Sequence, residues 1–186
     1  MTIDFKDKVA IVTGAGGGLG RSHAHELSKR GAKVVVNDLG GSVDGSGGSS
    51  DAAEKVVEEI TKSGGQAISN GSSVTDDDGV KLMIDQTIEE YGRIDILINN
   101  AGILLDKSFS KMEISDFEKV LNVHLTGTVK STKAVWEIMK EQNYGRILVT
   151  SSSSGLYGNF GQTNYGAAKL GLVGFMNTLK LEGQKY

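Results

Sequence analysis

The sequence contains no cysteine and only three histidines, and both shortages exclude kinds of site. Without cysteine, neither a disulfide framework nor a thiolate metal site can form. His23, His25 and His124 are too few and too scattered to predict a metal centre. We expect His23 and His25 to have helix-surface or packing roles.

Long apolar runs and clusters of positive charge are missing as well. Residues 1–8 hold no apolar run, so they do not form a signal peptide, and no stretch approaches the roughly 20 apolar residues of a membrane span. The net charge of −3, with no cluster of Lys or Arg, gives no general attraction to nucleic acid or anionic membranes. We therefore expect a soluble, intracellular protein with neither a nucleic-acid partner nor a membrane span.

Proline is absent, whereas glycine is abundant, with 26 residues. Glycine serves backbone positions with unusual dihedrals and also flexible linkers. Residues 39–50 are rich in Gly and Ser and predict a surface loop that is a flexible insertion. The length of 186 residues and the hydrophobic content of 38% favour a single domain over residues 1–186.

Short apolar segments alternate with longer segments of helical periodicity. Strands are expected over residues 8–12, 33–36, 66–69, 94–98 and 146–149. Helices are expected over residues 19–30, 51–62, 76–91, 115–141 and 164–182, and a Ser/Gly loop over 151–161. Ser115 and Glu118 fit a capping box at the start of the longest helix. This alternation predicts an α/β fold with a doubly wound, Rossmann-type parallel sheet, which binds ligands at the carboxyl ends of its strands.

A glycine cluster follows the first expected strand and opens a helix. The common dinucleotide pattern G-x-G-x-x-G fails because Leu19 stands at its last place, and no Gly-Lys-Ser/Thr of a Walker P-loop follows. The pattern T-G-x-x-x-G-x-G fits Thr13, Gly14, Gly18 and Gly20. Glycines here let backbone N–H groups approach a pyrophosphate at the positive end of the helix. The alternative is a glycine-rich turn that binds nothing.

Two further polar motifs follow expected strands. Asp38 ends the second strand, where a carboxylate accepts hydrogen bonds from ribose hydroxyls and repels a 2′-phosphate, so NAD is preferred over NADP. Asn99 and Asn100 end the fourth strand, and asparagine amides can bridge neighbouring strands and hold a cofactor pocket open. Plain turn residues are the alternative in both places.

Tyr165 and Lys169 stand four residues apart in an expected helix, so they share one face. A cation beside a phenol favours its ionised form, which makes a tyrosine plausible as a general acid and base. Ser152 lies 13 residues before Tyr165, where its hydroxyl could orient a substrate carbonyl. The alternatives are a solvated helix face for the pair and a polar loop for the serine, which is one of four in a row.

These motifs, in this order, make the sequence resemble the short-chain dehydrogenase/reductase family. The resemblance implies that Tyr165 is the proton donor and acceptor, that Lys169 assists it and holds the nicotinamide ribose, and that Ser152 positions the substrate oxygen. It also implies that NAD is the cofactor. The implied NAD site consists of Gly14, Gly18, Leu19, Gly20, Asp38, Ser73, Asn100, Tyr165 and Lys169.

Within the family, residues 36–41, 100–104, 123–125 and 155–162 are similar to the 3R-hydroxyacyl-CoA dehydrogenase domains of peroxisomal multifunctional enzymes. This resemblance implies NAD-dependent oxidation of a 3R-hydroxyacyl-CoA to the 3-ketoacyl-CoA in fatty-acid β-oxidation, in peroxisomes, by a homodimer. A steroid or a 3-ketoacyl carrier protein is the alternative substrate. The cytoplasm is the alternative compartment, because residues 182–186 are not a Ser-Lys-Leu signal.

The sequence also departs from the family pattern. His124 holds a place where many members have Asn, and Asn122 lies two residues earlier. Family members run to about 250 residues as one domain. Since this sequence stops at Tyr186, we expect the last strands of the family fold to be missing. A non-catalytic module that binds NAD or forms dimers is therefore an alternative to an enzyme.

Overall fold

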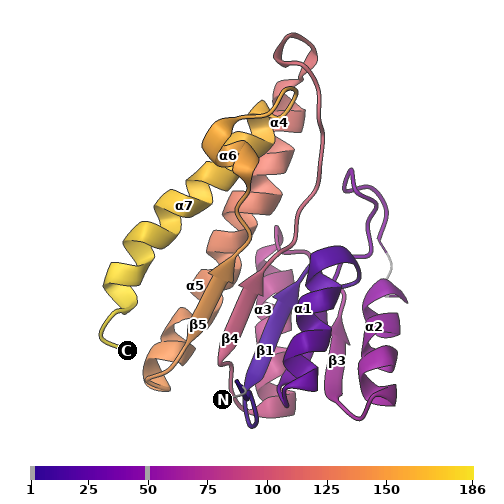
Figure 1. The fold of residues 1–186 in the computed structure, drawn as a ribbon, viewed down its shortest axis with the longest axis vertical. Coiled ribbons are helices and arrows are strands. Elements are labelled where there is room, and N and C mark those ends of the chain that lie inside the picture. Colours follow the sequence, from indigo (N-terminus) through magenta and orange to yellow (C-terminus); the bar gives the residue numbers. More distant parts are fainter. Residues whose placement is uncertain (1–2, 49–50) are drawn as a thin grey trace.

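The computed structural model describes residues 3–48 and 51–186, and its centre is a five-stranded parallel sheet in the order β3-β2-β1-β4-β5 (Figure 1). The strands are β1 (Val9–Thr13), β2 (Lys33–Asn37), β3 (Gln66–Asn70), β4 (Ile96–Asn99) and β5 (Arg146–Val149). Each lies within two residues of its expected position. The predicted doubly wound α/β sheet is therefore confirmed.

Helices connect the strands and cover both faces of the sheet. They are α1 (Gly18–Lys29), α2 (Asp51–Lys62), α3 (Asp77–Tyr91), α4 (Ile114–Leu121), α5 (Gly127–Glu141), α6 (Ser153–Tyr157) and α7 (Thr163–Gly183). Two short elements accompany them, the 3₁₀ helix η1 (Phe109–Lys111) and the π-helix η2 (Asn122–Thr126). Within the described ranges, no helix is long and apolar enough to cross a membrane.

The core consists of two layers, because successive side chains of a strand point to opposite faces of the sheet. On β1, Ala10 and Val12 pack against α1 and α2, whereas Ile11 packs against α3 and α5. Every residue of β1 and β4 is buried, and so are four of the five in β2. Burial on both faces explains why these strands are continuous apolar runs.

A buried charge ties the sheet together at its amino edge. Asp95, which is fully buried just before β4, accepts hydrogen bonds from the Arg93 guanidinium and from the backbone N–H of Val9. Burial alone would raise the pKa of this carboxyl, but the bonds from Arg93 and Val9 outweigh it and hold the pKa below the usual range. The ionised carboxylate therefore links β4 to β1 at the end of the sheet where the strands begin.

The expected helix over residues 115–141 is found in altered form. It begins at Ile114, with Glu113 at the N-cap position and no side-chain cap, so the capping box of Ser115 and Glu118 was wrong. The π-helix η2 then separates α4 from α5. An extra residue in one turn barely disturbs the apolar periodicity, which is why the sequence pattern did not reveal it.

The expected Ser/Gly loop over residues 151–161 was wrong in part, because residues 153–157 form the helix α6. Ser152 is its N-cap, and the Ser152 Oγ accepts a hydrogen bond from the Ser154 N–H at 3.1 Å. Serine is a favoured N-cap residue for this reason. A run of serines thus starts a helix here.

The loop after β2 is found over residues 39–48, and residues 49 and 50 of the expected loop lie outside the described residues. Its Val43 carbonyl accepts a hydrogen bond from the Leu104 N–H at 2.9 Å, and Lys119 Nζ donates to the Asp44 carbonyl at 3.0 Å. The loop therefore reaches from β2 to the segment after β4 and to α4, along the carboxyl edge of the sheet.

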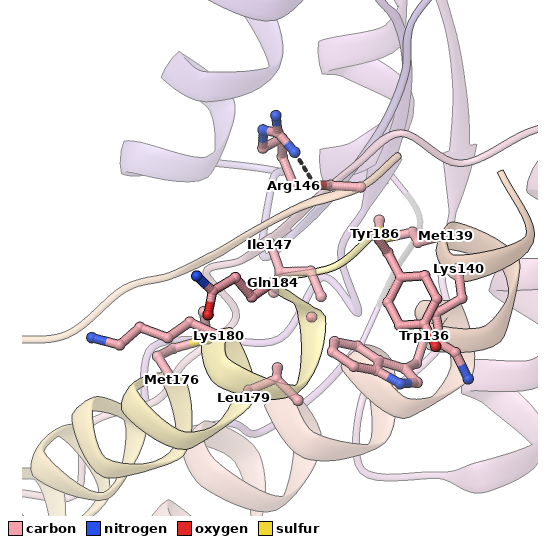
Figure 2. Close-up of a pocket in the computed structure, with 12 residues that line it drawn as sticks. Trp136, Met139, Lys140, Arg146, Ile147, Met176, Leu179, Lys180, Gln184 and Tyr186 are labelled. Atoms are coloured by element: carbon pink, nitrogen blue, oxygen red, sulfur yellow. Dashed lines mark hydrogen bonds between the residues drawn. The ribbon is translucent and has the colours of Figure 1, made fainter. Parts of the chain in front are cut away.

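The opposite, amino end of β5 borders a cavity of about 240 Å³ between α5, β5 and α7 (Figure 2). Its apolar lining includes Trp136, Met139, Ile147, Met176, Leu179 and Tyr186. On α7, Leu172 is fully buried, whereas Met176 and Leu179 line this cavity. The cavity lies at the first residues of β5, away from the carboxyl edge where the motifs gather.

Candidate active site

The polar motifs lie where β1, β2, β4 and β5 end, at the upper edge of the sheet in Figure 1. Because parallel strands end at the same edge, motifs far apart in sequence come together there. Among the described residues, no group of three or more His, Asp or Glu side chains is placed to hold a metal ion.

The glycine turn after β1 is packed too tightly for side chains. Gly14 has a left-handed φ of 62°, and a Cβ there would lie 2.7 Å from the Ala101 Cα. A Cβ on Gly20 would lie 2.1 Å from the Gly14 carbonyl oxygen and 2.6 Å from the Asn100 Nδ2. Real Cβ atoms do not approach other atoms this closely, so the spacing of these glycines is a packing requirement.

The outer side of the same turn is open. A Cβ built on Gly17 or Gly18 would meet no atom within 4 Å. Helix α1 begins at Gly18, and its N-cap Gly17 supplies no side-chain cap. Leu19 points outward with 63% of its side chain exposed, so it can offer only its backbone. An uncapped helix N-terminus beside open space suits a pyrophosphate.

Asp38 stands directly beside the glycine turn. Its Oδ2 accepts a hydrogen bond from the Gly16 N–H at 2.7 Å, and its Oδ1 accepts one from the Gly40 N–H at 2.7 Å. A Cβ on Gly16 would lie only 2.9 Å from this carboxylate. The two backbone bonds hold the Asp38 carboxylate next to the glycine turn.

Asn100 connects three strands, as its motif predicted. Its Nδ2 donates to the carbonyls of Thr13 (3.2 Å) and Gly14 (3.0 Å), and its Oδ1 accepts from the Thr150 Oγ1 at 3.5 Å. Its neighbour Asn99 turns the other way and donates to the Thr132 Oγ1 on α5. Of the two asparagines, Asn100 is the one that links the ends of β1, β4 and β5.

Thr13 is a residue whose contribution sequence reasoning missed. Its Oγ1 accepts hydrogen bonds from the N–H groups of Asn100 at 3.0 Å and Ala101 at 3.1 Å. The hydroxyl therefore fixes the segment after β4 to the end of β1. Its place before Gly14 in the pattern T-G-x-x-x-G-x-G was the available signal.

Ser73 has local contacts only. Its Oγ lies 2.8 Å from the Thr75 Oγ1 and accepts a hydrogen bond from the Thr75 N–H at 3.2 Å. These bonds shape the turn between β3 and α3. The adenine contact that the family resemblance implies for Ser73 stays a prediction.

Tyr165 and Lys169 lie in the first half of α7 with their functional groups close together. Lys169 Nζ is 5.4 Å from the centre of the Tyr165 ring and donates to the Thr150 carbonyl at 2.5 Å. The lysine is only 3% exposed, and this burial lowers the pKa of its ammonium to about 8. The helix therefore places a cation beneath a partly exposed phenol, in the arrangement that the spacing predicted.

Ser152 caps α6, which packs on the part of α7 that carries this pair. A Cβ on Gly155 of α6 would lie 2.8 Å from the Leu170 backbone nitrogen, so the helices touch through their backbones. The bond that Ser152 Oγ accepts uses a lone pair and leaves its O–H to donate elsewhere. Ser151 instead donates to the Lys169 carbonyl at 2.9 Å. The Ser151 hydroxyl therefore already donates within the chain, whereas the Ser152 hydroxyl is seen only as an acceptor.

His124, to which sequence reasoning gave no role, also reaches the site. Its ring lies edge-to-face against the ring of Tyr165, with centroids 5.1 Å apart and planes at 88°. It belongs to the π-helix η2, and such segments are frequent at functional sites. The only signal in the sequence was its departure from the asparagine of the family pattern.

Comparisons with known proteins agree on one family. A family model described as short chain dehydrogenase matches residues 8–186. The chain is 57% identical to the peroxisomal multifunctional enzyme A of Dictyostelium discoideum over 99% of its length. Among solved structures it is similar to the full-length peroxisomal multifunctional enzyme type 2 of Drosophila melanogaster (TM-score 0.78, 45% identity, 97% of this chain).

A further solved structure, 7α-hydroxysteroid dehydrogenase complexed with NADH and 7-oxo glycochenodeoxycholic acid, matches 97% of this chain and 67% of its own, with a TM-score of 0.89 and 29% identity. The relatives are longer than this chain. It spans 41% of the Dictyostelium enzyme and 29% of the Drosophila one.

Proposed function

The chain belongs to the short-chain dehydrogenase family, and we propose that it oxidises a secondary alcohol to a ketone with NAD. The proposed substrate is a 3R-hydroxyacyl-CoA, and the product is the 3-ketoacyl-CoA of fatty-acid β-oxidation. The observation that carries the proposal is the placement of Tyr165 over the buried Lys169, with Ser152 on the adjoining helix, at the sheet edge that holds the glycine turn.

The cofactor site fits NAD by the shape and charge of its residues. The open turn at Gly17 and Gly18 would receive the pyrophosphate, and the Asp38 carboxylate would bind the adenosine ribose and disfavour NADP. The buried ammonium of Lys169 would hold the nicotinamide ribose. When bound, NAD supplies the acceptor for the hydride that leaves the alcohol carbon.

The residues of the chain handle the proton and the oxygen. Tyr165 acts as the general base that accepts the proton of the substrate hydroxyl, with the Lys169 ammonium 5.4 Å from the centre of its ring. Ser152 donates its O–H to the substrate oxygen, which it orients and stabilises as the carbonyl forms.

Apolar side chains near the site support a substrate with a hydrocarbon part. Leu156, Tyr157 and Phe160 on and after α6 are 57%, 86% and 89% exposed. The segment after β4 is bound to the residues that follow Phe160, because the Gln162 Nε2 donates to Asp106 and the Lys107 N–H donates to the Gly161 carbonyl. An acyl chain can cover such a rim.

A steroid alcohol is the second candidate, because the same apolar rim suits a flat hydrocarbon skeleton. The structural similarity to a 7α-hydroxysteroid dehydrogenase favours it too. The peroxisomal names of relatives support peroxisomal localisation. We also infer a homodimer that pairs through α4, α5 and α7, as the family resemblance implies, which light scattering on the purified chain would test.

The test is to mix the purified chain with NAD and a 3R-hydroxyacyl-CoA and to follow NADH absorbance. The proposal is supported if NAD is reduced with the 3R isomer but not with the 3S isomer, and if this reduction is faster than with a steroid alcohol. Tyr165→Phe keeps the ring and removes only the hydroxyl, so turnover should fall roughly 10²–10⁴-fold while NAD still binds. Full activity of this variant would refute the assignment, and NAD binding without turnover in the unaltered chain would favour a non-catalytic module.

A further inference from the structure

His124 has an unusual hydrogen-bond environment. Its ring is buried, and its Nε2 lies 3.0 Å from the Ile103 backbone nitrogen and 2.8 Å from the Ile103 carbonyl oxygen. One nitrogen of a neutral imidazole either accepts or donates, so it pairs with only one of these groups at a time. In both tautomers Ile103 holds the ring through Nε2.

The other ring nitrogen has no partner. Among the described residues, the buried side-chain atoms without a hydrogen bond are the His124 Nδ1 and the Ser131 Oγ. A buried polar atom left unpaired costs free energy, and this one belongs to a ring that packs edge-to-face against the ring of Tyr165. Ser131 lies about two helical turns further along, in α5, and serves as a matched control.

The imidazole is neutral at physiological pH. Burial, and then the positive charge of Lys169, lower the pKa of His124 to about 4. A neutral ring in this place does not compete with Tyr165 for a proton. Its contribution to the site is therefore one of packing and hydrogen bonding.

The ring fills a space that Gly102 leaves open. A Cβ on Gly102 would lie 2.2 Å from the His124 Cε1 and 3.0 Å from each ring nitrogen. The φ of Gly102 is not in the left-handed region, so the backbone conformation does not require glycine there. The imidazole is what requires glycine at this position, because it fits between the segment after β4 and the Tyr165 ring, whose centroid is 5.1 Å away.

We propose that His124 is a positioning residue, a neutral imidazole wedged between Gly102–Ile103 and Tyr165 that fixes the phenol relative to the cofactor-binding end of β4. Asn100, whose amide donates to the Gly14 carbonyl of the glycine turn, lies in the same short segment as Gly102. A shift of this segment is transmitted to the phenol through the ring. Since hydride and proton transfer need aligned groups, the wedge sets the rate rather than the affinity.

Coupling from Gly102 to Tyr165 can be measured without turnover. In a chain with ¹³C-labelled tyrosine rings, Tyr165 is the resonance that disappears in Tyr165→Phe. Gly102→Ala should shift this resonance and leave those of the other tyrosines in place. In a His124→Asn background, which removes the ring, the same Gly102→Ala change should no longer shift it. An unmoved resonance, or an equal shift in both backgrounds, would overturn the proposal.

Kinetics give the second readout, and it rests on the proposed dehydrogenase function. His124→Asn should lower kcat about tenfold or more, with KM for substrate and the affinity for NAD within about threefold, because misplacement by about 1 Å costs up to roughly 100-fold in rate. Ser131→Ala should change neither. A purely structural role would lower the melting temperature of His124→Asn and spare kcat per folded molecule, which would overturn the positioning role.

The two readouts separate the hypotheses. If the unaltered chain binds NAD without turnover, the proposed function fails. The Tyr165 resonance still tests whether His124 positions the Tyr165 ring. If Gly102→Ala does not fold, no other substitution of Gly102 can replace it, because every other side chain has a Cβ that meets the His124 ring. The single variant His124→Asn then carries the test. Its Tyr165 resonance must then move relative to the unaltered chain, and the proposal is refuted if it stays.

Discussion

The two sides of the candidate active site are built differently. On the cofactor side, β1 and β4 are buried throughout, and the glycine turn fits against the segment after β4 without room for one more carbon atom. On the substrate side, β5 has partly exposed side chains along its length, Leu148 is 48% exposed, and Phe160 is 89% exposed. The cofactor side is thus part of the core, whereas the substrate side lies at its margin.

This difference has a physical consequence for mutations. A change on the cofactor side disturbs packing that also holds the fold, so binding and stability fall together. A change on the substrate side meets fewer neighbours, so it can alter the rate and leave the fold intact. Buried Lys169 is the exception on the substrate side, because its ammonium has little solvent around it.

The largest effect is expected from Gly20→Ala. The added Cβ would lie 2.1 Å from the Gly14 carbonyl oxygen, and backbone on both sides cannot move away without opening the turn. We expect a loss of more than about 4 kcal/mol in the free energy of unfolding, together with loss of NAD binding. Urea denaturation and calorimetric titration with NAD measure the two quantities.

Gly17→Ala is the matched control for this change. Gly17 has an extended backbone and no atom within 4 Å of a built Cβ, so stability should stay within about 0.5 kcal/mol. Equal destabilisation by Gly20→Ala and Gly17→Ala would show that the close packing around Gly20 does not determine the stability of the turn. The cofactor side would then not differ from the substrate side in this respect.

Ser152→Ala should have the next largest effect, and on rate rather than fold. Loss of a hydroxyl that stabilises the forming carbonyl oxygen should lower kcat about 10²–10³-fold, or roughly 3–4 kcal/mol. Loss of the N-cap bond to Ser154 should cost only about 1 kcal/mol in stability. Steady-state kinetics and thermal unfolding of the same sample separate the two effects.

The neighbouring serine provides the comparison. Ser151 donates to the Lys169 carbonyl, so Ser151→Ala should cost about 1 kcal/mol in stability and little in rate. If Ser151→Ala removed activity and Ser152→Ala did not, the roles given to the two serines would be reversed.

Lys169 should make stability depend on pH. Its folded-state pKa is about 8, below the ordinary lysine value of 10.5, so between these two pH values the unfolded chain binds more protons. The contribution of Lys169 to the free energy of unfolding is therefore most unfavourable below pH 8 and becomes less so as the pH rises toward 10.5, by about 3 kcal/mol in total. Urea denaturation at several pH values measures it.

Lys169→Met isolates this contribution. The difference in unfolding free energy between the unaltered chain and the variant should change by about 3 kcal/mol across that range, because other titrating groups cancel. A difference that stays constant with pH would mean that the ammonium is solvated in solution. Lys169→Met should also lose turnover. The substitution would then stabilise the fold below pH 8 and remove the function.

Part of this architecture could be read from the sequence. The strands were predictable because β1, β2 and β4 are buried on both faces and so read as apolar runs, and Tyr165 and Lys169 because helical periodicity alone sets their geometry. The bridging role of Asn100 followed from its place at a strand end.

Other features depend on contacts between distant segments, which local patterns do not encode. The π-helix around His124 and the space left by Gly102 exist because two segments 21 residues apart pack together. The helix α6 was hidden because serines are common in loops and also cap helices. The short sequence patterns thus located the reacting groups but not the neighbours that hold them.

The smallest effect is expected from Asp38→Asn, which removes charge from the cofactor side with little change in shape. The amide keeps one acceptor for either the Gly16 or the Gly40 N–H and loses the other bond, so stability should fall by about 1–2 kcal/mol. NAD binding should weaken about tenfold, and the preference for NAD over NADP should narrow, because the carboxylate no longer repels the 2′-phosphate. Titration with each cofactor measures both effects. An unchanged preference would place the discrimination elsewhere, and a loss of stability as large as that of Gly20→Ala would mean that the charge, and not only the packing, builds the cofactor side.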